Sequence, residues 1–155
     1  MKKSLIILVL IFVSLFSCER DDFCTLNPVT PSLVIRFCDA NDRDENLQVD
    51  SLFVWVPGRA DSLLISNAIT DSIAIPLNTT ALSTTYNFGL GTDLIETITV
   101  AYDPQEEFIS RSCGFRVIFN DVIVSRQNAT WIEDISPENI ETINSQNQAH
   151  VKIFH

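Results

Sequence analysis

The four cysteines of this chain are its best candidates for covalent or metal chemistry, and they are Cys18, Cys24, Cys38 and Cys113. Structural zinc needs thiolate and imidazole ligands in close pairs. These cysteines are widely spaced, and the sequence has neither a Cys-x-x-Cys nor a His-x-x-x-His pattern. We therefore expect no metal site and no cofactor.

Cys18 follows a leader-like segment. Two lysines precede an apolar run over residues 5–16. The run suits the core of a signal peptide and is shorter than the roughly 20 residues of a membrane-spanning helix. Residues 15–18, Leu-Phe-Ser-Cys, resemble the bacterial lipobox, in which lipid is attached to the cysteine sulfur and the chain is cut just before it. We expect residues 1–17 to be a signal peptide and Cys18 to carry the lipid. The alternatives are an ordinary signal peptide cut nearby and an uncleaved anchor.

The other three cysteines allow one disulfide and one free thiol in an exported protein. Cys113 alternates in phase with Phe115 and should face a core, whereas Cys38 is in phase with Arg36 and should face water. This pattern favours a Cys24–Cys113 bridge. Three free thiols are the alternative.

Hydrolytic chemistry has little support. Nucleophilic catalysis needs a base beside the nucleophile and a group that orients the base. The two histidines, His150 and His155, are five residues apart on the expected last strand and so face opposite sides. No Gly-x-Ser-x-Gly motif occurs. We expect no catalytic residues and no enzymatic activity.

Acidic residues form no convincing site either. Residues 39–46 have the spaced oxygen ligands of a calcium loop, but Arg43 takes a ligand position and Asp44 replaces the required glycine. Glu106 and Glu107 are adjacent, so on a strand they point to opposite faces and cannot act as an acid–base pair.

Aromatic side chains suggest one alternative function. Trp55 and Trp131, helped by Tyr86 or Tyr102, could stack on sugar rings. Tryptophans in such a chain more often pack in or near the core, so this ligand-binding role is the lesser hypothesis.

The charge balance excludes one class of partner. Asp and Glu number 20 against 10 Lys and Arg, a formal net charge of −10 at pH 7. Such a surface repels phosphate backbones, and no basic cluster offsets it. We therefore expect no nucleic-acid binding.

Short segments of alternating apolar residues, separated by turn residues, are typical of an all-β domain. The expected strands cover residues 33–38, 50–56, 63–66, 72–77, 86–90, 98–102, 108–119, 122–125, 131–135 and 149–154. Asp103-Pro104 and Asn120-Asp121 are read as breaks between strands.

These elements predict an antiparallel β-sandwich of about eight or nine short strands with Greek-key connections, immunoglobulin-like or transthyretin-like. A barrel is the second choice. The expected organisation is a signal peptide over residues 1–17, a lipid-anchored tether over 18–32 and a β-sandwich domain over 33–155.

Several stretches in order resemble a family of small Bacteroidota lipoproteins classed as a domain of unknown function. They are residues 19–22 with Cys24, 31–37, 75–79, 112–115 and 149–155. The resemblance implies a lipid-anchored envelope protein with a β-rich domain and supplies no activity. Cys38 stands where this family would have an aromatic residue, which agrees with its being the unpaired thiol.

The resemblance also bears on location. In that phylum, acidic residues after the lipidated cysteine resemble a signal for export to the cell surface, and residues 19–22 are a variant of it. We expect an outer-membrane protein, at the cell surface or on the periplasmic face. The leading function is a non-enzymatic module that binds an envelope protein or helps to assemble a complex, and the alternative is a glycan-binding accessory protein.

Overall fold

The computed structural model describes residue 24 and residues 29–59, 61, 63–91 and 93–155. The expected signal peptide and most of the expected tether, including Cys18, lie outside the described residues. The chain forms two compact units. Of the described residues, Cys24 and residues 108–115 belong to the smaller unit, and the rest, within 29–107 and 116–155, belong to the larger one.

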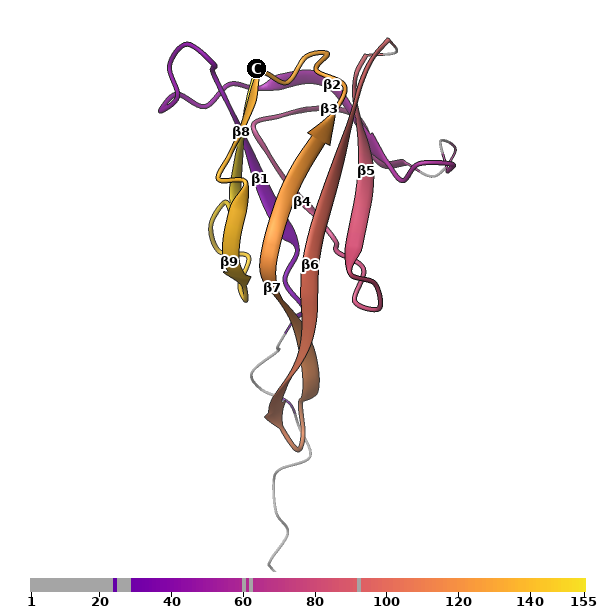
Figure 1. Cartoon of the computed structure of the whole chain (residues 1–155), viewed down its shortest axis with the longest axis vertical. Coiled ribbons are helices and arrows are strands. Elements are labelled where there is room, and N and C mark those ends of the chain that lie inside the picture. Colours follow the sequence, from indigo (N-terminus) through magenta and orange to yellow (C-terminus); the bar gives the residue numbers. More distant parts are fainter. Residues whose placement is uncertain (1–23, 25–28, 60, 62, 92) are drawn as a thin grey trace, which may run out of the picture. The chain divides into compact units, whose positions relative to one another are not determined.

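The larger unit is all-β, and its strands form two sheets packed on a common core (Figure 1). The four-stranded sheet has the order β4-β1-β10-β8 and the six-stranded sheet the order β3-β2-β5-β6-β7-β9. The strands are β1 (Leu33–Cys38), β2 (Val49–Trp55), β3 (Leu63–Thr70), β4 (Ser72–Ile75), β5 (Ser83–Leu90), β6 (Leu94–Ser110), β7 (Gly114–Gln127), β8 (Asp134–Ser136), β9 (Asn139–Ile143) and β10 (Val151–Phe154). The predicted β-sandwich is confirmed.

The core sits between the inward faces of the two sheets. Alternate residues of β1 and β10, such as Ile35 and Ile153, face Leu52 of β2 and Phe88 of β5, and all four are buried. Strands β1 and β10 run parallel, with Ile35 opposite Val151. The pairs β1–β4, β10–β8, β2–β3, β2–β5, β5–β6 and β7–β9 are antiparallel. The last strand of the chain is therefore a central strand of its sheet.

Proline does not end the sixth strand, contrary to the predicted break at Asp103-Pro104. The strand β6 runs unbroken from Leu94 to Ser110. Its pairing with β5 ends where Ala101 meets Ser83. Beyond that point β6 needs no hydrogen bonds toward β5, so the missing N–H of proline is tolerated there.

The predicted long strand over residues 108–119 is also wrong. It is divided by a turn over residues 111–113, after which Gly114 has a φ of 72°. Conversely, the predicted turn at Asn120-Asp121 lies inside β7, where Asp121 takes a φ of 49°. Aspartate visits this left-handed region more readily than most residues, so the strand continues through it.

Candidate functional site

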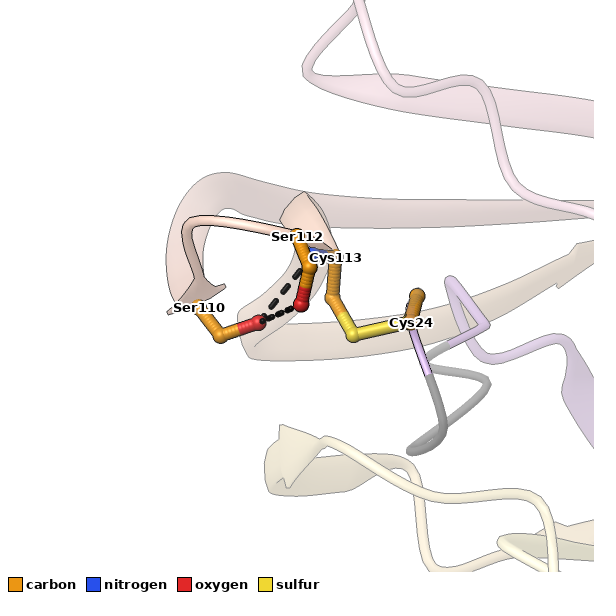
Figure 2. The surroundings of a disulfide bond; sticks show 4 residues. All are labelled: Cys24, Ser110, Ser112 and Cys113. Carbon is orange, nitrogen blue, oxygen red and sulfur yellow. Dashed lines mark hydrogen bonds between the residues drawn. A yellow bond between two sulfur atoms is a disulfide. The ribbon is translucent and has the colours of Figure 1, made fainter. Parts of the chain in front are cut away.

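A disulfide joins Cys24 to Cys113 within the smaller unit, and the predicted pairing is confirmed (Figure 2). The two Cα atoms are 4.7 Å apart, and the residues are separated by 89 positions in sequence. The turn that presents Cys113 is held by Ser110, whose hydroxyl accepts a hydrogen bond from the Cys113 N–H at 3.0 Å and lies 3.2 Å from the Ser112 hydroxyl. The bridge therefore connects the N-terminal segment to the turn between β6 and β7.

The reasoning behind that pairing was wrong on both cysteines. Cys113 lies in the turn rather than on an inward face, and it is partly exposed. Cys38 is fully buried and is the free cysteine among the described residues. It is buried despite sharing a face with Arg36 because the chain folds back over this end of β1, where Asn46 forms an isolated bridge with Cys38.

The same turn carries two aromatic rings in contact. Phe108 and Phe115 have ring centroids 5.2 Å apart with an interplanar angle of 60°. Their exposed fractions are 58% and 64%. Two large apolar side chains are therefore left in water beside the disulfide.

The two tryptophans do not form a shared platform. Trp131 is only 9% exposed, and its ring packs near Phe37 and His155 at centroid distances of 6.3 and 5.8 Å. Its indole N–H donates to the Phe88 carbonyl at 3.3 Å. The structure thus gives Trp131 a packing role, the more common role expected for the tryptophans, and leaves its ring little surface for stacking on a sugar.

Trp55 is half-buried on the outward face of β2. Its ring lies over Gly89 of the adjacent strand β5, where a Cβ would stand 3.0 Å from the nearest ring atom. Gly89 therefore makes room for the indole, and one face of that ring is covered by the sheet.

The two tyrosines are also structural. Tyr86 and Tyr102 are buried, and their hydroxyls donate to the carbonyls of Pro76 at 2.6 Å and Asn78 at 2.9 Å. These bonds fasten the connection between β4 and β5 to the six-stranded sheet. Neither ring is free to stack on a sugar.

The histidines do not converge on a common site. His150 precedes β10, where its Nδ1 accepts the Val34 N–H at 3.0 Å and its Nε2 donates to the Ser145 carbonyl at 2.8 Å. The pKa of His150 is lowered, chiefly because burial disfavours the charged ring. His155 follows β10 and packs against Phe37 with a centroid distance of 6.1 Å.

Glu96 is a buried charge that the sequence reasoning missed. It has no exposed surface, and its Oε2 accepts hydrogen bonds from the Thr130 N–H at 2.9 Å and the Thr130 hydroxyl at 3.0 Å. Its Oε1 lies 3.5 Å from the Arg126 guanidinium. Arg126 in turn donates to the carbonyls of Ile132 and Glu133. The group ties residues 130–133 to the six-stranded sheet.

Polar groups suited to metal binding or catalysis are not gathered in the described part of the chain. No cluster of three or more His, Cys, Asp or Glu side chains there could hold a metal ion. Among the described residues, one surface hollow of about 360 Å³ is lined by residues of β7 and β9, and another of about 360 Å³ is lined by residues 136–137 and 149–152. The second includes His150, whose two ring nitrogens are already engaged.

One strand edge is unusually open. The strand β3 lies at the end of the six-stranded sheet and is eight residues long, against four, three and five for the edge strands β4, β8 and β9. Its sequence, LLISNAIT, contains no charged residue, no proline and no glycine. Leu63, Leu64 and Ile69 on it are exposed.

Within the described ranges, no helix is long and apolar enough to cross a membrane. No curated protein matches the chain, and no solved structure does. A protein-family model, described as a family of unknown function (DUF6452), matches residues 47–155. This match covers all of the strands from β2 to β10 and more than half of the sequence, so the chain belongs to the DUF6452 family.

Proposed function

We propose that this protein is a Bacteroidota-type lipoprotein of the outer membrane, acylated at Cys18, whose β-sandwich binds a protein partner and catalyses no reaction. The lipidation rests on the apolar run over residues 5–16 and on the Leu-Phe-Ser-Cys sequence that follows it. An acylated cysteine contributes roughly 0.8 kcal/mol per buried methylene, enough for stable anchoring when several chains are attached. The fold then needs no membrane-spanning segment.

The observation that supports protein binding is the open edge of β3. Natural sheets protect their edges with short strands, charges or proline, because an unpaired row of N–H and C=O groups can pair with another chain. The strand β3 has none of these three protections in its sequence, although its pairing with β2 has register shifts between Val49 and Trp55. Its exposed leucine and isoleucine side chains add apolar contact to the main-chain hydrogen bonds of a strand laid alongside it.

The occupant that this edge fits is an extended segment of another envelope protein, added as a further strand. Such recognition takes affinity from backbone hydrogen bonds and specificity from alternate side chains. The glycan-binding alternative has weaker support, because Trp131, Tyr86 and Tyr102 are buried and only Trp55 is partly open.

A photo-crosslinking amino acid at position 69 tests this proposal in intact cells. Ile69 is 67% exposed on β3, so the replacement should not disturb the fold. The matched control is the same amino acid at Ile123, an exposed isoleucine on β7. We expect a discrete adduct with a second protein from position 69 and none from position 123, both in the membrane fraction.

Three results would contradict the proposal. Equal adducts from positions 69 and 123, or no adduct from position 69, would contradict the claim that β3 binds a protein partner. An adduct of twice the mass of the chain would identify a second copy as the occupant instead of another protein. Recovery of a Cys18→Ala form in the membrane fraction, processed as the wild type is, would refute the lipid anchor.

A further inference from the structure

The turn between β6 and β7 exposes an aromatic pair that contributes nothing to the sandwich core. Phe108 and Phe115 contact each other and are both more than half exposed. Single exposed apolar residues are common on soluble proteins, whereas a group of large ones marks an interaction surface. The Phe108–Phe115 pair is therefore a candidate surface for contact with an apolar partner.

The disulfide limits where that partner can be. Cys113, in the same turn, is bonded to Cys24, and both belong to the smaller unit. Cys24 follows Cys18 by six positions in the sequence. A fully extended chain spans at most about 3.6 Å per residue, so six residues place Cys24 within about 22 Å of residue 18. A lipid on Cys18 would hold this turn close to the leaflet.

The chemistry of the turn suits that surface. Residues 108–115 read FISRSCGF and contain one charged residue, Arg111, which is exposed. Residues 108–115 alone therefore carry one positive charge in a chain of net charge −10. Two glutamates, Glu106 and Glu107, precede them, and Glu107 is paired with Arg116 at 2.6 Å. Apolar aromatic side chains settle at the boundary between headgroups and acyl chains, and a nearby cation is attracted to anionic headgroups.

We propose that the Phe108–Phe115 pair inserts into the boundary between headgroups and acyl chains of the leaflet that carries the lipid anchor. The disulfide then acts as a second, protein-based tether that sets the β6–β7 turn against the membrane. This inference rests on the proposed lipidation of Cys18 and adds a lipid-contacting surface to it.

Depth-dependent fluorescence quenching tests the inference. The full-length protein, lipidated in cells, is reconstituted into phosphatidylethanolamine–phosphatidylglycerol vesicles with or without lipids brominated on the acyl chains. The variant is Phe115→Trp, and the matched control is Ile123→Trp, which also replaces an exposed apolar residue on β7. The fluorescence of the wild type, from Trp55 and Trp131, is subtracted from both.

We expect brominated lipids to quench the added tryptophan of Phe115→Trp at least about twofold more than that of Ile123→Trp. If Phe115→Trp does not fold, Phe108→Trp places the probe on the other ring of the pair. Equal quenching of the tryptophans at positions 115 and 123 would overturn the insertion. A protein that is bound to the vesicles but shows no quenching at position 115 or 108 would overturn it as well.

The mass of the protein extracted from membranes separates this inference from the proposed function. A lipidated mass together with equal quenching refutes the insertion and leaves the anchor standing. A mass without lipid refutes the anchor itself, and the inferred insertion falls with it.

Discussion

The carboxylate of Glu96 points inward from β6, in phase with the apolar Ile98 and Val100. Burying a charge is costly unless hydrogen bonds and an opposite charge compensate for it. Thr130 supplies two hydrogen bonds and Arg126 supplies the charge, although Arg126 itself is partly exposed. This arrangement gives Glu96 a structural role, because it fastens the segment that carries Trp131.

His150 should make the stability of the fold depend on pH. Its Nδ1 accepts the Val34 N–H, so protonation of that nitrogen would replace a hydrogen bond with two opposed donors. Burial lowers its pKa below the ordinary value of 6.5, against a smaller opposing effect of the bond to Ser145. The unfolded chain therefore binds this proton more readily than the folded chain does.

The free energy of unfolding should follow from that difference. The stability linked to His150 is complete above about pH 6.5 and declines as the pH falls from there toward the lowered pKa of the folded state. Asp39 and Asp134 also have lowered pKa values, but from 3.8, so their contributions are lost only at more acidic pH. Urea unfolding between about pH 7.5 and 5 should show the decline, and His150→Asn, which keeps an acceptor near Nδ1, should flatten it. The same slope in both proteins would contradict this role.

At the scale of single residues, the sequence identifies chemistry better than surroundings. The Cys24–Cys113 pair is as predicted, although the strand-phase argument for it was wrong for both Cys113 and Cys38. Cys38 is buried because a non-regular loop around Asn46 covers it. The burial of Glu96 was missed because its partners, Thr130 and Arg126, lie more than 25 residues away in sequence. The one clue in the sequence is that Glu96 shares its strand face with the apolar residues Ile98 and Val100.

At the scale of elements, alternation of apolar residues located most strands. The strand β1 is Leu33–Cys38 as predicted, and β2 is shifted by one residue from the expected 50–56. The strand β9 was missed, because NIETI has only two large apolar residues and follows a proline. It is defined by its pairing with β7, where Phe119 faces Ile143, and such long-range pairing leaves little trace in a short segment.

Strand position also predicts which isoleucines matter for stability. Ile153 is fully buried on the central strand β10, whereas Ile69 is exposed on the edge strand β3. Ile153→Ala should lower the free energy of unfolding by about 2–5 kcal/mol, because it removes buried methyl groups and leaves a cavity. Ile69→Ala should change it by no more than about 0.5 kcal/mol. Urea denaturation of the two variants checks this, and similar losses would argue against the observed strand order.

At the scale of the whole molecule, an acidic β-sandwich of the DUF6452 family follows an N-terminal sequence that indicates a lipid anchor. The net charge of −10 disfavours contact with an anionic leaflet through most of the surface. If Cys18 is lipidated as we propose, attachment to the leaflet depends mainly on its acyl chains. The sequence predicted the sandwich because strand alternation is a local signal, but it could not predict which edge stays open, since edge position depends on how all the strands are ordered.

Chemical labelling of one primary amine can show on which side of the membrane the sandwich lies. The lysines are Lys2, Lys3 and Lys152, and the first two would leave with the signal peptide. A fully acylated N-terminus would then leave Lys152, which is partly exposed on β10, as the one primary amine.

We expect a membrane-impermeant, amine-reactive biotin to label the protein equally on intact and broken cells, because residues 19–22 resemble a surface-export signal. Lys152→Arg should abolish the labelling and so confirm its site. Labelling that appears only after the cells are broken would place the domain on the periplasmic face, and the protein partner of β3 would then have to be sought there.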